Sequence, residues 1–249
     1  MFSLTLDNPD LLKNTMSIVS EMIDEGVLKI DSNGLSLLSP DRNVIVVVDF
    51  KLLSTAFSDF QITQPTSVGL NFSNLVSILK RTKSNEKVTL RLKENKLEVV
   101  IEGDGKRKFD LPTLDLKSEN PPIDQLNFAG RVDLESSIFE QGVEDADVVS
   151  DSMVFELNKE AFKLRAKGDI SSAELELKKG ENGLLNLEAS EAMRARYPID
   201  YLKKITKACK LAKQVSLEFG NNYPIRISFT QMDKVNLNFI LAPRIADDE

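Results

Sequence analysis

The side chains that could carry chemistry in this chain are almost entirely carboxylates and lysines. Among its 249 residues there is no histidine and only one cysteine, Cys209. The absence of histidine excludes a Ser-His-Asp or Cys-His nucleophile, an imidazole general base and any zinc site that contains histidine. A single cysteine excludes an internal disulfide and fits a reducing compartment, where Cys209 is expected to be buried and inert.

The carboxylates do not single out a catalytic pair, because acids are abundant along the whole chain. The densest acidic cluster consists of Glu144, Asp145, Asp147 and Asp151. Its spacing is not that of an EF-hand, so a solvated helix end is the interpretation we favour over a cation site. No Walker A loop and no G-x-G-x-x-G motif occurs. The sequence therefore predicts no metal and no cofactor.

The basic residues are concentrated on two segments that are expected to be helical, residues 72–82 and 198–212. The cations on these segments or directly after them are Lys80, Arg81, Lys83, Lys203, Lys204, Lys207 and Lys210. The net charge of the chain is −7, so its cations are segregated from its acids. This pattern favours a surface that faces nucleic-acid phosphates without reading bases. The alternative is solubility combined with favourable cations near helix C-termini.

Length and composition describe the scaffold that must position these residues. A chain of 249 residues fits one large domain or two ordinary ones. With 41% hydrophobic and 29% charged residues it can bury a core and stay in solution. The N-terminus lacks the basic start and apolar run of a signal peptide, and the longest apolar stretch, Val44 to Val48, is too short to cross a bilayer. We expect a soluble intracellular protein that does not act at a membrane.

The chain repeats itself once, at a nearly constant spacing. Paired positions in the strands are Leu28, Ile30, Leu35 and Leu37 with Phe155, Leu157, Phe162 and Leu164. Paired positions in the basic segments are Leu75, Ile78 and Lys80 with Leu202, Ile205 and Lys207. The rival explanation is that half-buried strands all look alike, but it accounts poorly for the helices with their lysines.

Each half is expected to contain two helices and many antiparallel strands. The expected strands of the first half are 3–6, 27–31, 34–39, 44–50, 67–71, 87–93, 96–102 and 107–111. Its first helix is expected to follow the cap Asn8, and its second to span residues 72–82. Residues 116–127 hold Pro121 and Pro122 and are predicted to form an extended linker. The predicted domains are therefore residues 1–115 and 128–249, in an α+β fold with the helices on one face of the sheets.

Four segments carry a resemblance to a known family. They are Leu241-Ala242-Pro243-Arg244-Ile245, Asp147-Val148-Val149-Ser150-Asp151-Ser152, Gly34 to Asp41, and Tyr201-Leu202-Lys203. Over nearly its whole length the chain resembles the sliding clamps of archaea and eukaryotes, the proliferating cell nuclear antigen (PCNA) family. The two-domain subunit of that family agrees with the internal repeat.

The resemblance implies a non-enzymatic trimeric ring whose helices line the hole and whose sheets form the outside. Such a ring encircles duplex DNA, independently of sequence, and acts as a processivity factor. Implied clients are a DNA polymerase, a flap endonuclease, a DNA ligase and a clamp loader, bound through peptides of the PIP-box type. The implied location is the cytoplasm with the nucleoid in an archaeon, or the nucleus in a eukaryote.

The resemblance also implies three sets of site residues. The DNA-facing set is Lys13, Lys80, Arg81, Lys83, Lys203, Lys204, Lys207 and Lys210. The partner-peptide groove is implied at Pro40, Val44, Ile45, Leu126, Pro224, Ile240, Ala242 and Pro243. Subunits would join edge to edge through Arg107, Phe109, Leu111, Ala173, Leu175 and Leu177.

One feature departs from the family. The expected helix Leu134 to Ala146 carries acids such as Glu140, Glu144 and Asp145, where the family usually has basic residues. This weakens the expectation of a uniformly positive channel. Two other functions stay open at this point: a subunit of a heterotrimeric replication or checkpoint clamp, and, from a different class, a carboxylate-based hydrolase of β-rich fold.

Overall fold

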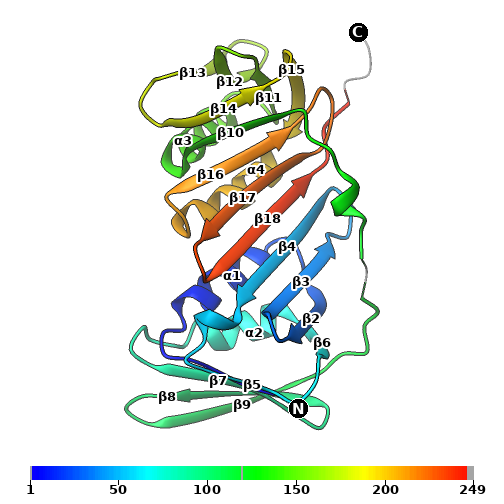
Figure 1. Cartoon of the computed structure of the whole chain (residues 1–249), viewed down its shortest axis with the longest axis vertical. Helices are drawn as coiled ribbons and strands as arrows, with labels where there is room; N and C mark the ends of the chain where they lie inside the picture. Colours follow the sequence, from blue (N-terminus) through cyan, green and yellow to red (C-terminus); the bar gives the residue numbers. More distant parts are fainter. Residues whose placement is uncertain (1, 119, 246–249) are drawn as a thin grey trace. The chain divides into compact units, whose positions relative to one another are not determined.

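The computed structural model describes residues 2–118 and 120–245 (Figure 1). The chain divides into two compact units that are discontinuous in sequence. Unit 1 comprises Met1–Arg42, Val48–Pro121 and Gln231–Leu237, and unit 2 comprises Asn43–Val47, Pro122–Thr230 and Asn238–Glu249. Each unit therefore borrows a short segment from the other half of the chain, which the sequence did not indicate.

Unit 1 contains two helices and most of nine strands. Its helices are α1 (Asp10–Val19) and α2 (Phe72–Leu79), and a short 3-10 turn, η1, covers Ser54–Ala56. Its strands are β1 (Phe2–Leu6), β2 (Glu25–Asp31), β3 (Gly34–Pro40), β4 (Val46–Leu53), β5 (Asp59–Ile62), β6 (Thr66–Asn71), β7 (Lys87–Lys93), β8 (Lys96–Glu102) and β9 (Lys106–Pro112).

Unit 2 contains the remaining helices and strands. Its helices are α3 (Ser136–Asp147) and α4 (Ile199–Thr206), with 3-10 turns η2 (Ile123–Gln125) and η3 (Lys207–Lys210). Its strands are β10 (Gly130–Glu135), β11 (Ser152–Leu157), β12 (Ala161–Lys167), β13 (Ser172–Lys178), β14 (Leu184–Ala189), β15 (Met193–Pro198), β16 (Gln214–Phe219), β17 (Ile225–Gln231) and β18 (Val235–Leu241).

The strand order of unit 1 is repeated in unit 2, which confirms the α+β repeat. The order β5-β1-β7-β8-β9 recurs as β14-β10-β16-β17-β18, and β4-β3-β2-β6 recurs as β13-β12-β11-β15. Neighbouring strands such as β7 and β8, or β11 and β12, run antiparallel. The β4 and β18 strands also run antiparallel: in unit 1 Leu53 N donates to Lys234 O at 2.8 Å, and in unit 2 Ala242 N donates to Ile45 O at 2.9 Å.

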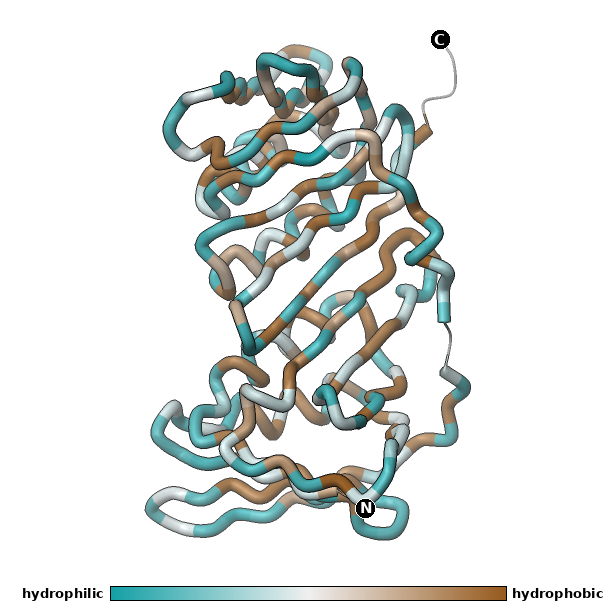
Figure 2. The backbone as a smooth tube through the Cα atoms, viewed as in Figure 1, coloured by the Kyte–Doolittle hydropathy of each residue, from teal (hydrophilic) through white to brown (hydrophobic). Residues whose placement is uncertain are grey.

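Hydrophobic and hydrophilic residues alternate along several strands (Figure 2). This alternation puts one face of each sheet into a core. In unit 1 the buried residues include Leu4, Leu12, Met16, Phe50 and Phe72. In unit 2 Phe155 forms the centre of an aromatic cluster, and its ring makes edge-to-face contacts with Phe139, Phe162, Tyr197 and Phe219. The buried Tyr197 hydroxyl is satisfied because it donates to the Tyr223 carbonyl at 2.7 Å.

The expected spans of β7 and β8 are confirmed residue for residue, whereas several others were wrong at their ends. Strand β4 begins at Val46 rather than Val44, because Val44 has a φ of +56° that no strand residue adopts. The helix expected from Leu134 begins at Ser136, because Leu134 is a buried residue of β10 opposite Val215 of β16. The four-residue strand β5 was missed because its alternation is too short to recognise.

Candidate functional site

The basic residues that follow α2 are exposed on a turn fixed by its own hydrogen bonds. The helix ends at Leu79, and the buried Thr82 hydroxyl donates to the Leu79 carbonyl at 2.7 Å. Lys80, Arg81 and Lys83 are all exposed. The turn thus presents three cations from one helix end, where they are also favourable to the helix dipole.

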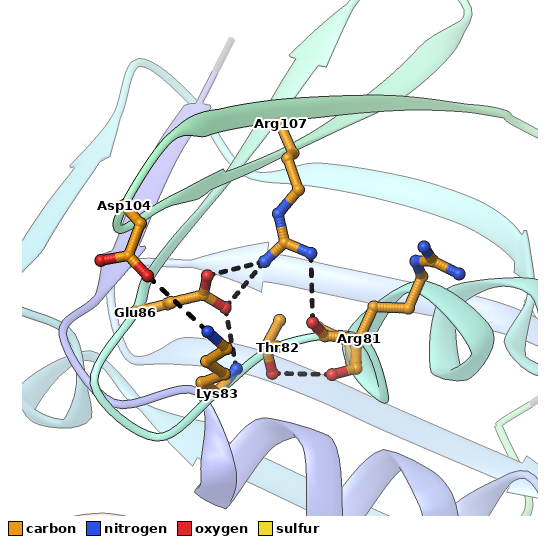
Figure 3. A network of polar contacts seen from close by, with 7 residues as sticks. Arg81, Thr82, Lys83, Glu86, Asp104 and Arg107 are labelled. Atoms are coloured by element: carbon orange, nitrogen blue, oxygen red, sulfur yellow. Dashed lines mark hydrogen bonds and ion pairs between the residues drawn. The ribbon is translucent and has the colours of Figure 1, made fainter.

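A polar network joins this basic turn to the edge strand β9 (Figure 3). Nη2 of Arg107 donates to both carboxylate oxygens of Glu86, at 2.8 and 2.7 Å, and Nη1 donates to the Arg81 carbonyl at 3.2 Å. Glu86 also accepts the Lys83 N–H at 2.8 Å. This backbone bond, together with the nearby Arg107 charge, lowers the pKa of Glu86 below its usual value.

Sequence reasoning missed the role of Glu86 and Asp104 in that network. Lys83 Nζ lies 3.7 Å from an Asp104 carboxylate oxygen, in the turn between β8 and β9. A Cβ at Gly103 would lie 2.7 Å from Glu86 Cγ, so the turn closes tightly over Glu86. The signal available in the sequence was Arg107, a cation at a position of β9 whose neighbours Phe109 and Leu111 are apolar.

The second basic segment is divided between α4 and the 3-10 turn η3. Lys203 pairs with Asp147 at 2.7 Å, and this hydrogen bond raises the pKa of Lys203. The Lys204 ammonium lies 5.4 Å from the centre of the Tyr201 ring. Lys207 and Lys210 are exposed on η3. The segment predicted to be one helix therefore tightens after Thr206, which the sequence did not reveal.

The acidic helix α3 contacts the basic helix α4 within unit 2. The Asp147–Lys203 ion pair joins the ends of the two helices, while Glu144 and Asp145 are exposed. Asp133 and Glu135 belong to β10 rather than to the helix. The cationic surface of α4 is thus partly neutralised by its neighbour, which limits how strongly this region attracts phosphates.

Lys13 on α1 differs from the other predicted DNA-facing cations. Its side chain is 20% exposed and its ammonium lies 2.5 Å from Asp10, one turn earlier. The Lys13 hydrogen bond lowers the pKa of Asp10. A contact with phosphate would have to compete with this local pair, so Lys13 is a weaker candidate than the exposed Lys80.

Part of the predicted partner groove is assembled within unit 2. The backbone hydrogen bond from Ala242 to Ile45 sets these two residues side by side. Val44 is 71% exposed and has a left-handed backbone. The other half-buried members in this unit are Leu126, Pro224 and Pro243, whereas Ile240 is 6% exposed and belongs to the core. Pro40 is half-buried and lies in unit 1.

Arg226 anchors the end of the predicted linker to unit 2. It stacks on the Phe128 ring, 4.7 Å from its centre, and donates to the Ile123 carbonyl at 3.4 Å. Next to Pro243, the Arg244 guanidinium donates to Asp151 at 2.6 Å and lowers the pKa of that carboxyl. These contacts hold the chain near Leu126 and next to Pro243, two of the residues predicted to form the groove.

The predicted subunit-interface residues lie on two strands that end their sheets. Within the described residues, β9 pairs only with β8 and β13 pairs only with β12. Leu111 and Leu177 are buried, while the other four members, Arg107, Phe109, Ala173 and Leu175, are half-buried. Both strands thus keep partly exposed apolar side chains beside an unpaired backbone edge.

Residues 2–118 and 120–245 contain neither a candidate metal site nor a candidate membrane-spanning helix. No group of three or more acids, cysteines or histidines in this part of the chain is placed to hold a metal ion. The acidic cluster is instead divided, since Asp147 pairs with Lys203 and Asp151 with Arg244. In the same ranges, no helix is long and apolar enough to cross a membrane.

Two family models match consecutive parts of the chain. Residues 1–124 match the N-terminal domain of proliferating cell nuclear antigen, and residues 122–244 match its C-terminal domain. A "DNA polymerase sliding clamp" of Thermococcus gammatolerans is 32% identical over 247 residues, which cover 99% of both chains. A protein of the same name from Pyrococcus furiosus is 30% identical with the same coverage.

A solved structure shows the same fold. The crystal structure of PCNA from Thermococcus kodakaraensis superimposes with a TM-score of 0.91 at 25% sequence identity. The alignment covers 98% of this chain and all of the other. The likeness therefore extends over both units and is not limited to one of the two repeats.

Proposed function

Because the chain belongs to the proliferating cell nuclear antigen family of sliding clamps, we propose that three copies of it close into a ring around duplex DNA. The observation that carries the proposal is the repeated strand order, which leaves an unpaired edge at β9 in unit 1 and at β13 in unit 2. Joining β9 of each copy to β13 of the next would pair these two edges in all copies and close a ring.

The mechanism of such a ring is topological. A closed ring cannot leave a duplex sideways, so it stays on DNA without tight direct binding. Exposed cations such as Lys80, Arg81 and Lys207 would contact phosphates without reading sequence. Such contacts are salt-sensitive and individually weak, which allows the ring to slide.

We assign the groove around Ile45 and Ala242 to the binding of client peptides. Val44 supports this assignment, because a β-branched residue in a left-handed conformation is rare and it exposes 71% of its surface here. Both features cost stability, which is typical of a residue retained for binding. A peptide with aromatic anchors would suit this apolar surface, and a polymerase, flap endonuclease, ligase or clamp loader could be tethered through it.

The family is a non-catalytic scaffold, and we propose the same for this chain. The ion pairs of Glu86, Asp147 and Asp151 with cations argue against these acids as a hydrolase pair. The relatives come from archaea, which supports a place with the nucleoid in the cytoplasm. No cofactor or metal enters the proposed mechanism.

The decisive experiment combines solution mass with retention on DNA. Light scattering at micromolar concentration should give about 83 kDa, three times the 27.8 kDa chain. Loaded onto nicked circular DNA, the ring should co-elute with the circle and be released when a restriction enzyme linearises it. A mass near that of one chain would point instead to a subunit of a heterotrimeric clamp. A trimer retained equally on linear DNA would contradict encirclement.

A further inference from the structure

The two edge strands carry opposite charges on their outward faces. On β9 the exposed charged residues are Lys106, Lys108 and Asp110, so the face is positive on balance. On β13 the exposed charged residues are Glu174, Glu176 and Lys178, so the face is negative on balance. Both strands have seven residues and the same burial pattern. If the strands pair, the exposed residues of one can therefore lie opposite the exposed residues of the other along their whole length.

The direction of pairing follows from the repeat inside the chain. Strand β9 occupies the position in unit 1 that β18 occupies in unit 2, and β13 corresponds in the same way to β4. The β4 and β18 strands run antiparallel, as the bonds Leu53 to Lys234 and Ala242 to Ile45 require. A contact between β9 and β13 of two copies would repeat this arrangement, and it is therefore also antiparallel.

We propose that β9 of one copy pairs with β13 of the next in the register that sets Lys108 opposite Glu174 and Lys106 opposite Glu176. The inference rests on the proposed ring and specifies how its subunits recognise one another. Opposite charges directly across an antiparallel pair attract, and like charges repel. The same chain supplies both edges, so the complementarity favours a ring made from copies of this chain alone.

Neighbouring registers are disfavoured by the same charges. A shift of two residues in one direction keeps one favourable pair, Lys108 with Glu176, but sets Lys106 opposite Lys178 and Asp110 opposite Glu174. A shift of two residues in the other direction keeps only Lys106 with Glu174, because Lys108 then lies opposite the uncharged Ser172. A shift of one residue would turn the half-buried faces away from each other.

The inward faces fit this register as well. Phe109 then lies opposite Ala173, so a large ring meets a small side chain. Arg107 lies opposite Leu175, and its guanidinium is already held by Glu86 and by the Arg81 carbonyl (Figure 3). Only the apolar stem of Arg107 is therefore offered to the neighbouring leucine.

The outward pairs would extend ion pairs that exist in each copy. Glu174 lies 2.8 Å from Arg165 and Glu176 lies 2.9 Å from Lys163, while Lys106 pairs with Glu102. Within the described parts of the chain, Lys108 has no ion-pair partner. Each carboxylate can accept more than one donor, so a lysine from the next copy can join without breaking the local pair.

Cysteine cross-linking tests the register directly. In a Cys209→Ala background, Lys108→Cys with Glu174→Cys is expected to give disulfide-linked trimers on mild oxidation. Two mismatched pairs, Lys108→Cys with Glu176→Cys and Lys106→Cys with Glu174→Cys, should cross-link at least tenfold more slowly. Directly opposite Cβ atoms lie about 5 Å apart and diagonal ones about 7 Å, whereas a disulfide needs about 4 Å.

Charge reversal provides a second, independent readout. Lys106→Glu with Lys108→Glu should weaken trimer formation about tenfold or more at low salt, and adding Glu174→Lys with Glu176→Lys should restore it. The matched control, Lys117→Glu with Lys234→Glu, changes net charge equally on exposed residues outside β9 and β13 and should leave the trimer intact.

The outcomes separate the register from the ring. A trimer that cross-links best through a mismatched pair would overturn the register while the ring stands. A trimer whose stability is unchanged by charge reversal would overturn the electrostatic recognition. A chain that stays monomeric and forms no cross-link in any pair would overturn both the register and the proposed ring of identical copies.

Discussion

One nitrogen of Arg107, Nη2, donates to both carboxylate oxygens of Glu86, at 2.8 and 2.7 Å. Arg107 belongs to the edge strand β9, and Glu86 also binds the backbone of Lys83 in the basic turn after α2. The same arginine thus connects the strand proposed to join subunits with the cations proposed to face DNA. A displacement of the strand is therefore expected to shift the basic turn.

Loss of this pair should affect both stability and assembly. Glu86→Gln keeps the size of the side chain but removes the charge that Arg107 and the Lys83 N–H stabilise. We expect a lower midpoint of thermal unfolding and weaker trimer formation, measured by calorimetry and light scattering. Glu94→Gln, in the exposed turn between β7 and β8, is the control. Equal behaviour of the two variants would show that the network is dispensable.

Gly34 is predicted to tolerate no side chain. Its φ is +140°, and a Cβ would lie 2.1 Å from the Leu52 carbonyl oxygen. Gly34→Ala should lower the free energy of unfolding by about 1–3 kcal/mol or more, as measured by urea denaturation. Gly105→Ala is the matched control, because a Cβ there meets nothing within 4 Å and should change stability by less than about 0.5 kcal/mol.

The exposed cations should account for the salt dependence of DNA binding. Lys80→Ala and Lys207→Ala are each expected to weaken binding of the clamp to short duplexes uniformly across sequences. The slope of log affinity against log salt should fall by about one for each phosphate that the variant no longer binds. Lys179→Ala, on the turn before β14, should leave the slope unchanged. An effect that depends on DNA sequence would contradict backbone-only recognition.

Cys209 should be slow to react in the folded protein. Cys209 is half-buried rather than fully buried as expected. Its partial burial, and to a lesser extent the charge of Glu140, raises the pKa of the Cys209 thiol to about 12. The thiol therefore stays protonated at pH 8, where an unfolded cysteine, with a pKa near 8.5, is partly ionised. Reaction with a disulfide reagent should accelerate markedly on unfolding, and the stability linked to this thiol should be lost as pH rises from about 8.5 toward 12.

Val44 should trade stability for peptide binding. Val44→Asn suits the left-handed backbone better, because asparagine tolerates positive φ, so stability should hold or rise by about 0.5 kcal/mol. Affinity for a labelled peptide with aromatic anchors should fall about tenfold, the value of burying one valine side chain. Val148→Asn, also highly exposed but with an ordinary helical backbone, should change neither. Unchanged affinity in Val44→Asn would remove Val44 from the groove.

Much of the scaffold could be predicted from local pattern. Strands β7 and β8 were predicted residue for residue, because their alternation is regular and Gly103 to Gly105 marks the turn that follows. The helices were found from their apolar spacing, as with Leu75 and Ile78 of α2. The pattern was misleading at Val44, because its left-handed backbone cannot continue the strand. It also missed β5, because four residues are too few to show an alternation.

The sequence by itself determined the repeat, the antiparallel α+β fold, the segregation of cations to the end of α2 and to α4 with η3, and the exclusion of histidine chemistry. These properties depend on residue type and spacing along one chain. Only the tertiary structure decided that Arg107 holds Glu86, that Asp147 neutralises Lys203, and that β9 and β13 end their sheets. The reason is physical: ion pairs and sheet edges depend on which distant segments meet in space, and no local periodicity encodes that meeting.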